Sequence, residues 1–494
     1  MQSQSVLPYS DLTISRPLGI VEYLWLSSRG MRGFMDMFTV VALDCSDRHV
    51  THKDVETAFS IIRLRHPLLG SRLSRTSSSP LPELMYAVPM TDAHAIREAR
   101  ANLEFGTFQD RDTAMSTLRE RGIKSPPSTA IDVRSSMSFI VWLEGIGSSS
   151  GQHVIGLLIP HFITDARRKL GVLHEMMELL AAPERLQSEL AQLCATAAVS
   201  IQLPAPLDSK VPDLSACSAD ELRKAREVFD ELTKFSKMPR SGLVPDGTPD
   251  EDKYAGRALH HTFSPDQTTS ILRACKVLGV TITSLILSAM AFATLPRKDA
   301  QRSGDQTTSN SDDDVRHFHA TVLVDLSTRL PEPPSGGDNV TLWVGSSPVF
   351  MQTPGSSTAQ HEGIDAIWAV AKQCRERHAA YLQSPYFWHF NELYASMTMA
   401  PWNPVPEGKA FLPAFSSLGD CSNLLSSSNG IDIVDIAFAG TVSPEAVVAV
   451  AWTYKGMLNY QLRHNASRTT ATLIDPFFQR VVDILMKASL EDVA

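Results

Sequence analysis

Charged residues are scarce in this sequence, and the charge that is present is mostly acidic. Of the 494 residues only 20% are Asp, Glu, Lys or Arg, and the formal net charge is -9 at pH 7. Proteins that bind nucleic acids normally carry clusters of Lys and Arg, and the sequence has no block rich in these residues. We therefore expect no nucleic-acid partner.

Long apolar runs are also lacking. The longest apolar stretch, residues 282–295, is interrupted by Thr283 and Ser288 and is followed by Pro296. It is shorter than the ~20 residues that a membrane-spanning helix needs. Residues 1–5 carry neither basic residues nor an apolar segment, which predicts no signal peptide. We therefore expect a cytoplasmic protein without a membrane span.

Cysteine is infrequent and unclustered. The six cysteines are Cys45, Cys194, Cys217, Cys275, Cys374 and Cys421. No C-x-x-C pair occurs, and no spacing is typical of a zinc site. This distribution predicts reduced, mostly structural thiols and no bound metal.

The length and apolar content of the chain predict two domains. A single core rarely organises 494 residues, and 43% of the residues are hydrophobic, enough for two sizeable cores. Residues 200–257 are rich in proline and irregular in pattern, which is typical of a crossover linker. We therefore predict an N-terminal domain over residues 1–199, this linker, and a C-terminal domain over residues 258–494. Strand and helix patterns alternate in both halves, which favours an α/β fold.

The clearest local pattern is a buried strand followed by a helix. Residues 154–159 are continuously apolar, as in a central strand covered on both faces, and residues 166–180 follow a helical pattern. Elsewhere Thr51 and Ser264 are suitable helix N-caps. Residues 454–457 are typical of a hairpin turn.

A histidine stands at the junction between that strand and that helix. Residues 161–165 read HFITD, a histidine followed four residues later by an acid. The same spacing begins at four other histidines, which are His52, His94, His174 and His361. Those four lie in helical or polar patterns, where such a pair is an ordinary exposed helix face. Only His161 lies where a scaffold presents a side chain into a cleft.

An imidazole in that position suits acyl transfer to an alcohol. A hydroxyl is a weak nucleophile, and a base with a pKa near neutrality takes its proton as it attacks a thioester carbonyl. His161 is the candidate base, and Asp165 would fix the loop that orients the ring. The residues alone leave an alternative open, in which His161 is a hydrogen-bonded core histidine and Asp165 a helix N-cap.

Three basic residues open the helix that follows. Arg167, Arg168 and Lys169 lie in its first turn, where the helix dipole disfavours cations. An anionic group therefore compensates them, either Asp165 or the phosphates of a cofactor. We name the three as candidate cofactor-binding residues, and a tolerated basic turn is the alternative.

These residues resemble a known superfamily. Residues 160–165, PHFITD, look like the HxxxD motif of chloramphenicol acetyltransferase-like proteins. Residues 65–69 (RHPLL), 324–329 (VDLSTR) and 454–458 (YKGML) resemble further elements of that group in the same order. The superfamily includes plant BAHD acyltransferases, alcohol acetyltransferases, fungal trichothecene O-acetyltransferases and condensation domains of peptide synthetases. The trichothecene enzymes are the nearest in type.

The resemblance implies two chloramphenicol acetyltransferase-like α/β sandwich domains with the active site between them. It implies that His161 is the general base and that Asp165 is structural and pairs with an arginine, for which Arg329 is the candidate. Two residues depart from the family pattern. Ala166 replaces a glycine, and Ser327 stands where an arginine is common. Whether these two residues impair acyl transfer is left open by the sequence.

The function that follows is CoA-dependent O-acylation, with acetylation the expected case, of a small secondary metabolite. Acyl-CoA would be a co-substrate, an alcohol the acceptor, and the protein a monomer. One alternative takes the acyl group from an acyl carrier protein, as condensation domains do, although the motif has one histidine and not two. Another is a member that binds and cyclises a polyketide without acyl transfer.

Overall fold

The computed structural model describes residues 12–490 apart from several internal segments. The segments left out are residues 31–32, 46, 76–80, 125–130, 239, 249–253, 296–314, 332–339, 354–362, 399–408 and 412. His361, one of the histidines with acid spacing, lies outside the described residues.

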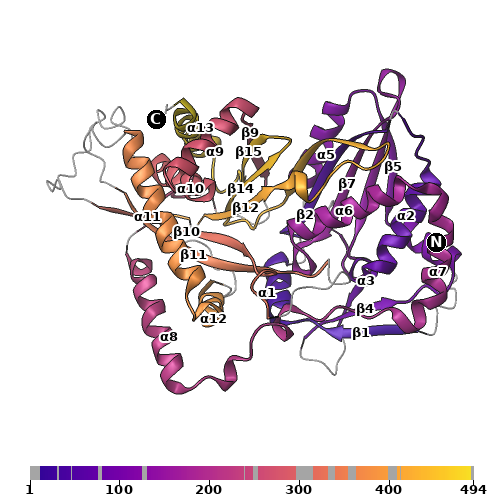
Figure 1. Ribbon diagram of the computed structural model, residues 1–494, viewed down its shortest axis with the longest axis horizontal. Helices are drawn as coiled ribbons and strands as arrows, with labels where there is room; N and C mark the ends of the chain where they lie inside the picture. The colour runs from indigo at the N-terminus through magenta and orange to yellow at the C-terminus, as the bar shows by residue number, and fades with distance from the viewer. Residues whose placement is uncertain are drawn as a thin grey trace. The chain divides into compact units, whose positions relative to one another are not determined.

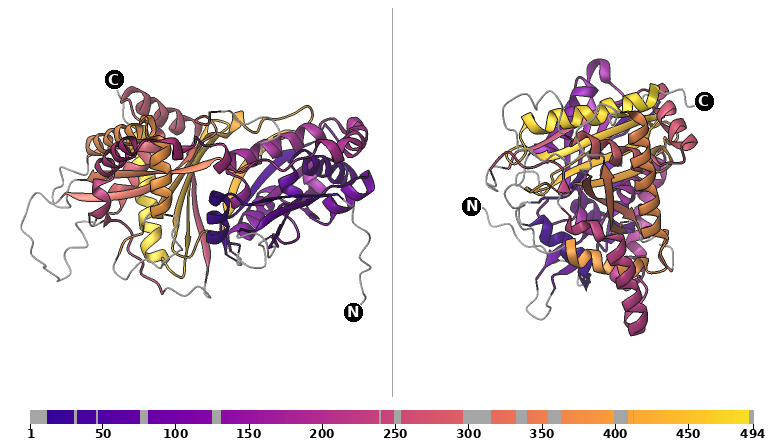
Figure 2. Two further views of the ribbon diagram at one scale, coloured as in Figure 1. Left: turned by 90° about the horizontal axis from the view of Figure 1, so that it is seen from below. Right: turned by 90° about the vertical axis from the view of Figure 1, so that its left-hand side faces the viewer.

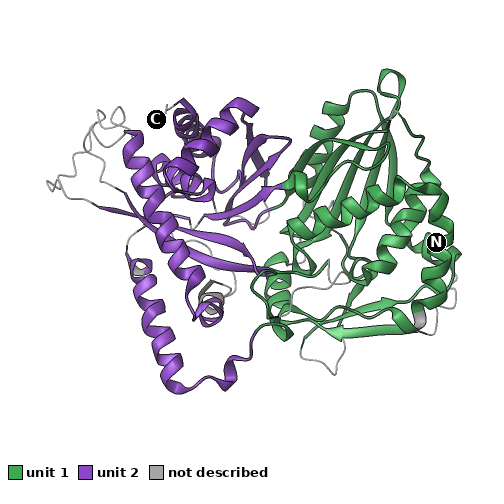
Figure 3. Ribbon diagram, in the orientation of Figure 1, with its two compact units in different colours: residues 1–211, 327–343, 421–441 green, residues 212–326, 344–420, 442–494 purple. Residues whose placement is uncertain are grey.

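Contacts within the chain divide it into two compact units (Figure 3). Unit 1 comprises residues 1–211, 327–343 and 421–441, and unit 2 comprises residues 212–326, 344–420 and 442–494. The sequence predicts one C-terminal domain over residues 258–494, whereas the structure assigns two segments of that range to unit 1. The physical reason is strand pairing, because residues 432–440 form an edge strand of the unit 1 sheet.

Unit 1 contains the N-terminal helices and two sheets (Figure 1). Its helices are α1 (Ile20–Arg29), α2 (His52–Arg65), α3 (Pro67–Gly70), α4 (Asp92–Arg100), α5 (Arg111–Lys124), α6 (Ala166–Leu180) and α7 (Pro183–Ser200). Its strands are β1 (Thr13–Pro17), β2 (Asp36–Asp44), β3 (Arg72–Ser74), β4 (Glu83–Ala87), β5 (Leu103–Phe108), β6 (Phe139–Gly145), β7 (Gln152–Pro160) and β13 (Asp432–Gly440).

The main sheet of unit 1 has five strands in the order β13-β2-β7-β6-β5, with β7 in the centre. All neighbours are antiparallel except β5 and β6. Nearly every residue of β7 is buried, as the continuous apolar pattern predicts. Helix α5 packs on β2, β7 and β13, where Gly122 and Gly156 leave room for the Phe38 ring. A smaller sheet has the order β1-β4-β3.

Unit 2 is built from a seven-stranded sheet and a group of helices (Figures 1 and 2). Its strands are β8 (Arg240–Ser241), β9 (Gly256–Thr262), β10 (Arg316–Asp325), β11 (Val344–Thr353), β12 (Ala414–Asp420), β14 (Val447–Tyr454) and β15 (Met457–Asn465). Its helices are α8 (Ala219–Leu232), α9 (Pro265–Val277), α10 (Ile282–Ala293), α11 (Ile364–Gln383), α12 (Phe387–Thr398) and α13 (Ala471–Leu490).

The core of unit 2 lies between the sheet and four helices. The strand order is β11-β10-β12-β14-β15-β9, and β8 pairs with β10. Alternate residues of β10, β14 and β15 pack with α9, α10, α11 and α13 in one buried cluster. This period of two places one face of each strand in the core.

Several elements begin and end where the sequence predicts. Helix α6 spans residues 166–180, and Thr51 caps α2 with a capping box to Asp54. Ser264 caps α9 in the same way. At the turn between β14 and β15, Lys455 and Gly456 have φ angles of 46° and 76°, as a tight hairpin turn requires.

Within the described residues no single helix is long and apolar enough to cross a membrane. Helices α9 and α10 taken together have the length and apolar composition of a membrane span, but the pair is bent by 98°. No group of three His, Cys, Asp or Glu side chains in the described part of the chain comes together to hold a metal ion. All six cysteines, each of which the structure describes, are free thiols.

Candidate functional site

His161 lies at the end of the central strand of unit 1. Strand β7 ends at Pro160, and residues His161–Ile163 form one turn of 3-10 helix before α6 begins at Ala166. Phe162 and Ile163 are buried, whereas His161 is half-exposed. The two buried side chains anchor the turn and so fix the half-buried imidazole between strand and helix.

Helix α1 supplies a ring that stacks on the imidazole. The Trp25 and His161 ring centroids are 4.2 Å apart, and the two planes make an angle of 22°. Stacking of this kind fixes the plane of the imidazole and covers one of its faces. The sequence gives no signal for this contact, because the two residues are 136 positions apart (161 − 25).

A buried ion pair holds α1 against the same end of the sheet. Arg29 donates from Nε to Asp36 Oδ1 at 2.6 Å and from Nη2 to Asp36 Oδ2 at 2.8 Å. Asp36 lies opposite Pro160 in the pairing of β2 with β7. Arg29 is four residues after Trp25 and therefore on the same side of α1. The pair thus positions Trp25 beside the turn that carries His161.

Burial raises the pKa of the Asp36 carboxyl, and the positive charges of Arg29 and Lys169 oppose that rise. The side chains of Arg29 and Asp36 are only 4% and 5% exposed, so this is an ion pair shielded from water. Breaking such a pair by removing one partner is strongly destabilising, because the other charge stays buried.

Asp165 ties the turn to the protein backbone. It is the N-cap of α6, and its Oδ1 accepts a hydrogen bond from the Arg168 backbone N–H at 3.0 Å. Its Oδ2 accepts one from the Trp343 backbone N–H at 3.3 Å, within unit 1. The side chain is 5% exposed. These contacts give Asp165 the N-cap role that the residues alone left open.

The predicted arginine partner of Asp165 lies in the same segment of unit 1 as Trp343. Arg329 is half-buried, and burial lowers the pKa of its guanidinium. Ser327, which departs from the family pattern, begins this segment. The pairing of Arg329 with Asp165 stays a prediction.

The three basic residues of α6 have different surroundings. Arg167 and Arg168 are half-exposed, whereas Lys169 is 1% exposed and close enough to Asp36 to influence its ionisation. A buried ammonium near a carboxylate suits an internal ion cluster better than contact with a soluble cofactor. Arg167 and Arg168 remain the candidates for phosphate binding.

The three described histidines of the same spacing, His52, His94 and His174, lie on helices α2, α4 and α6. His94 and Glu98 are 3.8 Å apart on α4, and His174 and Glu178 are 3.8 Å apart on α6. His52 contacts Glu144 at 3.8 Å, whereas Glu56, the acid four residues after His52, binds Arg100 at 2.8 Å.

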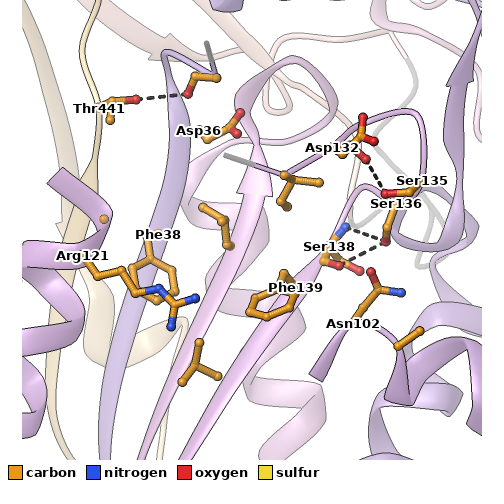
Figure 4. A pocket seen from close by; sticks show the side chains of 16 residues that line it. Asp36, Phe38, Asn102, Arg121, Asp132, Ser135, Ser136, Ser138, Phe139 and Thr441 are labelled. Atoms are coloured by element: carbon orange, nitrogen blue, oxygen red, sulfur yellow. Dashed lines mark hydrogen bonds between the residues drawn. The ribbon is translucent and has the colours of Figure 1, made fainter. Parts of the chain in front are cut away.

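A cavity of about 290 Å³ lies in unit 1 beside β2 and α5. Its wall includes Asp36, Phe38 and Leu158, so it begins next to the strand end that precedes His161. Figure 4 shows Arg121 and Phe38 on one side and Ser135, Ser136 and Ser138 on the other, with Phe139 between them. The wall is mixed in character, with apolar rings and hydroxyl groups.

No protein-family model matches the chain, and no curated protein matches it in sequence. Solved structures do match over nearly the whole length. The TRI3 trichothecene 15-O-acetyltransferase from Fusarium sporotrichioides is 15% identical with a TM-score of 0.72, over 96% of this chain and 95% of that one. The first condensation domain of the CDA synthetase is 13% identical with a TM-score of 0.65, over 97% of both chains.

The SgcC5 protein from Streptomyces globisporus gives a third match, 13% identical with a TM-score of 0.61 over 96% of this chain and 98% of that one. At such identities the likeness establishes the fold alone. The chain has the two-lobed α/β fold of these three solved structures, which confirms the fold class that the resemblance in residues 160–165 implies.

Proposed function

We propose that this protein transfers an acyl group, with acetyl the expected case, from CoA to a hydroxyl of a small secondary metabolite. A terpenoid or polyketide alcohol is the class of acceptor we infer. The observation that carries the proposal is the placement of His161. It follows the central strand of a fold shared with an O-acetyltransferase, and its ring is half-buried and stacked on Trp25.

In the proposed reaction His161 acts as general base. An imidazole nitrogen takes the hydroxyl proton as the alcohol oxygen attacks the thioester carbonyl carbon. The carbon–sulfur bond then breaks, and the CoA thiolate takes the proton back from the imidazolium. The acyl group passes directly to the acceptor without an acyl-enzyme, and Asp165 keeps the turn in place through its two backbone contacts.

The test is thiol release from acetyl-CoA in the presence of a panel of alcohol metabolites. His161→Ala should lower kcat by about 10²-fold to 10⁴-fold, the usual contribution of a general base, and leave KM nearly unchanged. His174→Ala is the matched control, because it has the same acid spacing on the surface of α6. Wild-type turnover by His161→Ala, or loss of turnover in His174→Ala, would contradict the proposed base.

The phosphate contacts of CoA are assigned to Arg167 and Arg168. Replacing both by Ala should raise KM for acetyl-CoA and leave KM for the alcohol unchanged, because only the donor carries phosphates. Arg185→Ala, an exposed arginine on α7, is the control for general loss of charge. An unchanged KM for acetyl-CoA in the double variant would remove this assignment.

A carrier protein is the second candidate donor, which the match to a condensation domain over 97% of the chain supports. The single histidine of residues 160–165 argues for the CoA donor instead. The two are separated by supplying the same acyl group on free CoA and on a phosphopantetheinylated carrier protein. Turnover with the carrier-bound group alone would replace the CoA proposal.

A further inference from the structure

Arg63 of α2 is a buried guanidinium in unit 1. Its side chain is only 5% exposed, and it stands over the Phe59 ring at 5.6 Å. Its Nη1 donates to Ser136 Oγ at 3.1 Å, to Ser138 Oγ at 3.3 Å and to the Leu69 carbonyl at 3.4 Å. Every one of these acceptors is neutral. Among the described residues no carboxylate lies within ion-pair distance of Arg63.

This arrangement leaves the charge of Arg63 poorly compensated. Burying a cation without a counterion in direct contact is expensive. Burial lowers the pKa of Arg63, and the charges of Tyr86 and Glu98 oppose that shift from a distance. All three hydrogen bonds leave from Nη1, whereas a guanidinium has five N–H groups. The Nε–H and the two Nη2–H groups have no acceptor among the described residues. They form the edge that binds a carboxylate or a phosphate in bidentate fashion.

Arg63 lines a cavity of about 230 Å³, which is several times the ~30 Å³ that one water molecule occupies. The cavity lies among α2, α4 and β4, and its wall also contains Arg72 and Arg134. Glu98 is the one carboxylate among its described lining residues, and it contacts His94 at 3.8 Å. Arg134 is largely exposed and pairs with Asp132 at 2.9 Å, so the buried cation of this wall is Arg63.

We propose that this cavity binds a small oxyanion, a phosphate or a carboxylate group, on Nε and Nη2 of Arg63. The anion supplies the charge and the acceptors that the protein leaves out. None of the lining residues belongs to residues 160–165, so the site is separate from the proposed catalytic turn and does not depend on acyl transfer.

The test is thermal unfolding of the full chain with sodium phosphate, sodium acetate and sodium chloride at matched ionic strength. A specific site gives a rise in Tm that saturates with concentration, because a ligand that binds only the folded state stabilises it by mass action. Saturation with phosphate identifies a phosphate site, and saturation with acetate identifies a carboxylate site. If neither phosphate nor acetate raises Tm more than chloride does, the proposal is overturned.

Arg63→Met keeps the length of the side chain and removes its charge. The apparent Kd of the anion should rise about 10-fold to 100-fold, the ratio expected for a lost hydrogen bond to a charged group. Arg97→Met, an exposed arginine on α4 outside the cavity wall, is the control and should keep the wild-type Kd. Non-specific stabilisation by phosphate does not depend on Arg63 and would persist in Arg63→Met. A Tm rise that still saturates with anion concentration in Arg63→Met would therefore also overturn the proposal.

If Arg63→Met does not fold, the half-exposed Arg72 of β3 provides the second variant. Arg72→Met removes another positive charge from the cavity wall without emptying the buried Arg63 position. A weaker apparent affinity for the anion supports the site. An unchanged affinity overturns it.

Discussion

The stacked pair of Trp25 and His161 links α1 to the candidate base through a contact between single residues. A flat ring at 4.2 Å restricts rotation of the imidazole and keeps water from one of its faces. A general base acts only when its nitrogen points at the proton it removes. Trp25 is therefore a positioning residue for the proposed reaction, acting through His161.

Trp25→Ala should lower kcat/KM about 10-fold, because an aromatic pair contributes roughly 0.5–1.5 kcal/mol beyond its buried area. Trp25→Phe should recover most of the loss, since a phenyl ring also stacks. Tyr23→Ala, which removes a half-exposed ring from the same helix, serves as the control. Equal activity in Trp25→Ala and the wild type at unchanged Tm would show that the stacking has no role.

His464 of β15 gives a prediction for the acid stability of unit 2. Its side chain is fully buried, and burial with the nearby Arg257 charge lowers the pKa of the imidazole to about 4. The unfolded chain keeps an ordinary pKa of ~6.5 and so binds more protons between these values. Stability is therefore complete above pH 6.5 and falls as the pH decreases towards 4.

The loss should reach about 3 kcal/mol near pH 4, from a separation of roughly 2.5 pKa units. Urea unfolding between pH 7 and pH 4 measures it. In His464→Gln the slope over this window should flatten, whereas in His174→Gln, whose side chain is 31% exposed, it should match the wild type. A slope unchanged in His464→Gln would assign the acid sensitivity to other groups.

At the scale of elements, the junction of β7, the 3-10 turn and α6 depends on Asp165. One carboxylate oxygen caps the helix and the other holds the Trp343 backbone. This side chain serves local architecture, and in the proposed reaction it would act only by fixing where the turn that carries His161 lies.

Asp165→Ala should lower the free energy of unfolding by about 2–4 kcal/mol, the sum of a lost N-cap and an unsatisfied buried N–H group. Asp165→Asn should lose less, because Asn is also a good N-cap. Ser264→Ala, which removes the N-cap of α9 in unit 2, should lower stability by about 1 kcal/mol and leave activity unchanged. Full stability of Asp165→Ala with abolished turnover would give Asp165 a direct catalytic role.

At the scale of the whole molecule, unit 1 is assembled from three separate segments of the chain. Strand β13 pairs with β2 along nearly its whole length, although the two are almost 400 positions apart. Its residues Ile433, Ile436 and Phe438 are buried in unit 1. The N-terminal segment alone therefore lacks one edge of its main sheet.

A fragment of residues 1–211 should not unfold cooperatively, because β2 would present an unpaired edge and an uncovered apolar surface. Fusing residues 421–441 to its end through a flexible linker should restore part of the cooperative transition, measured by circular dichroism on heating. The control fuses the same residues in scrambled order. A cooperative transition in the unfused fragment would mean that β13 is dispensable for unit 1.

Much of the local structure follows from the sequence. Helix α6, the capping boxes at Thr51 and Ser264 and the hairpin at residues 454–457 appear where local patterns place them. These features depend on hydrogen bonds between residues three or four apart or on turn preferences, so nearby residues carry the information. The placement of His161 between strand and helix follows for the same reason.

Tertiary structure alone decides the surroundings of that histidine. The stacking of Trp25, the pair of Arg29 with Asp36, the tie from Trp343 to Asp165 and the burial of Lys169 join residues distant in sequence. The pairing of β13 with β2 in unit 1 also joins residues that are distant in sequence. Local propensity and periodicity describe which face of an element is apolar, but they do not state which other element covers it. The sequence therefore determines where the candidate base lies along the chain, and long-range packing determines what holds it in position.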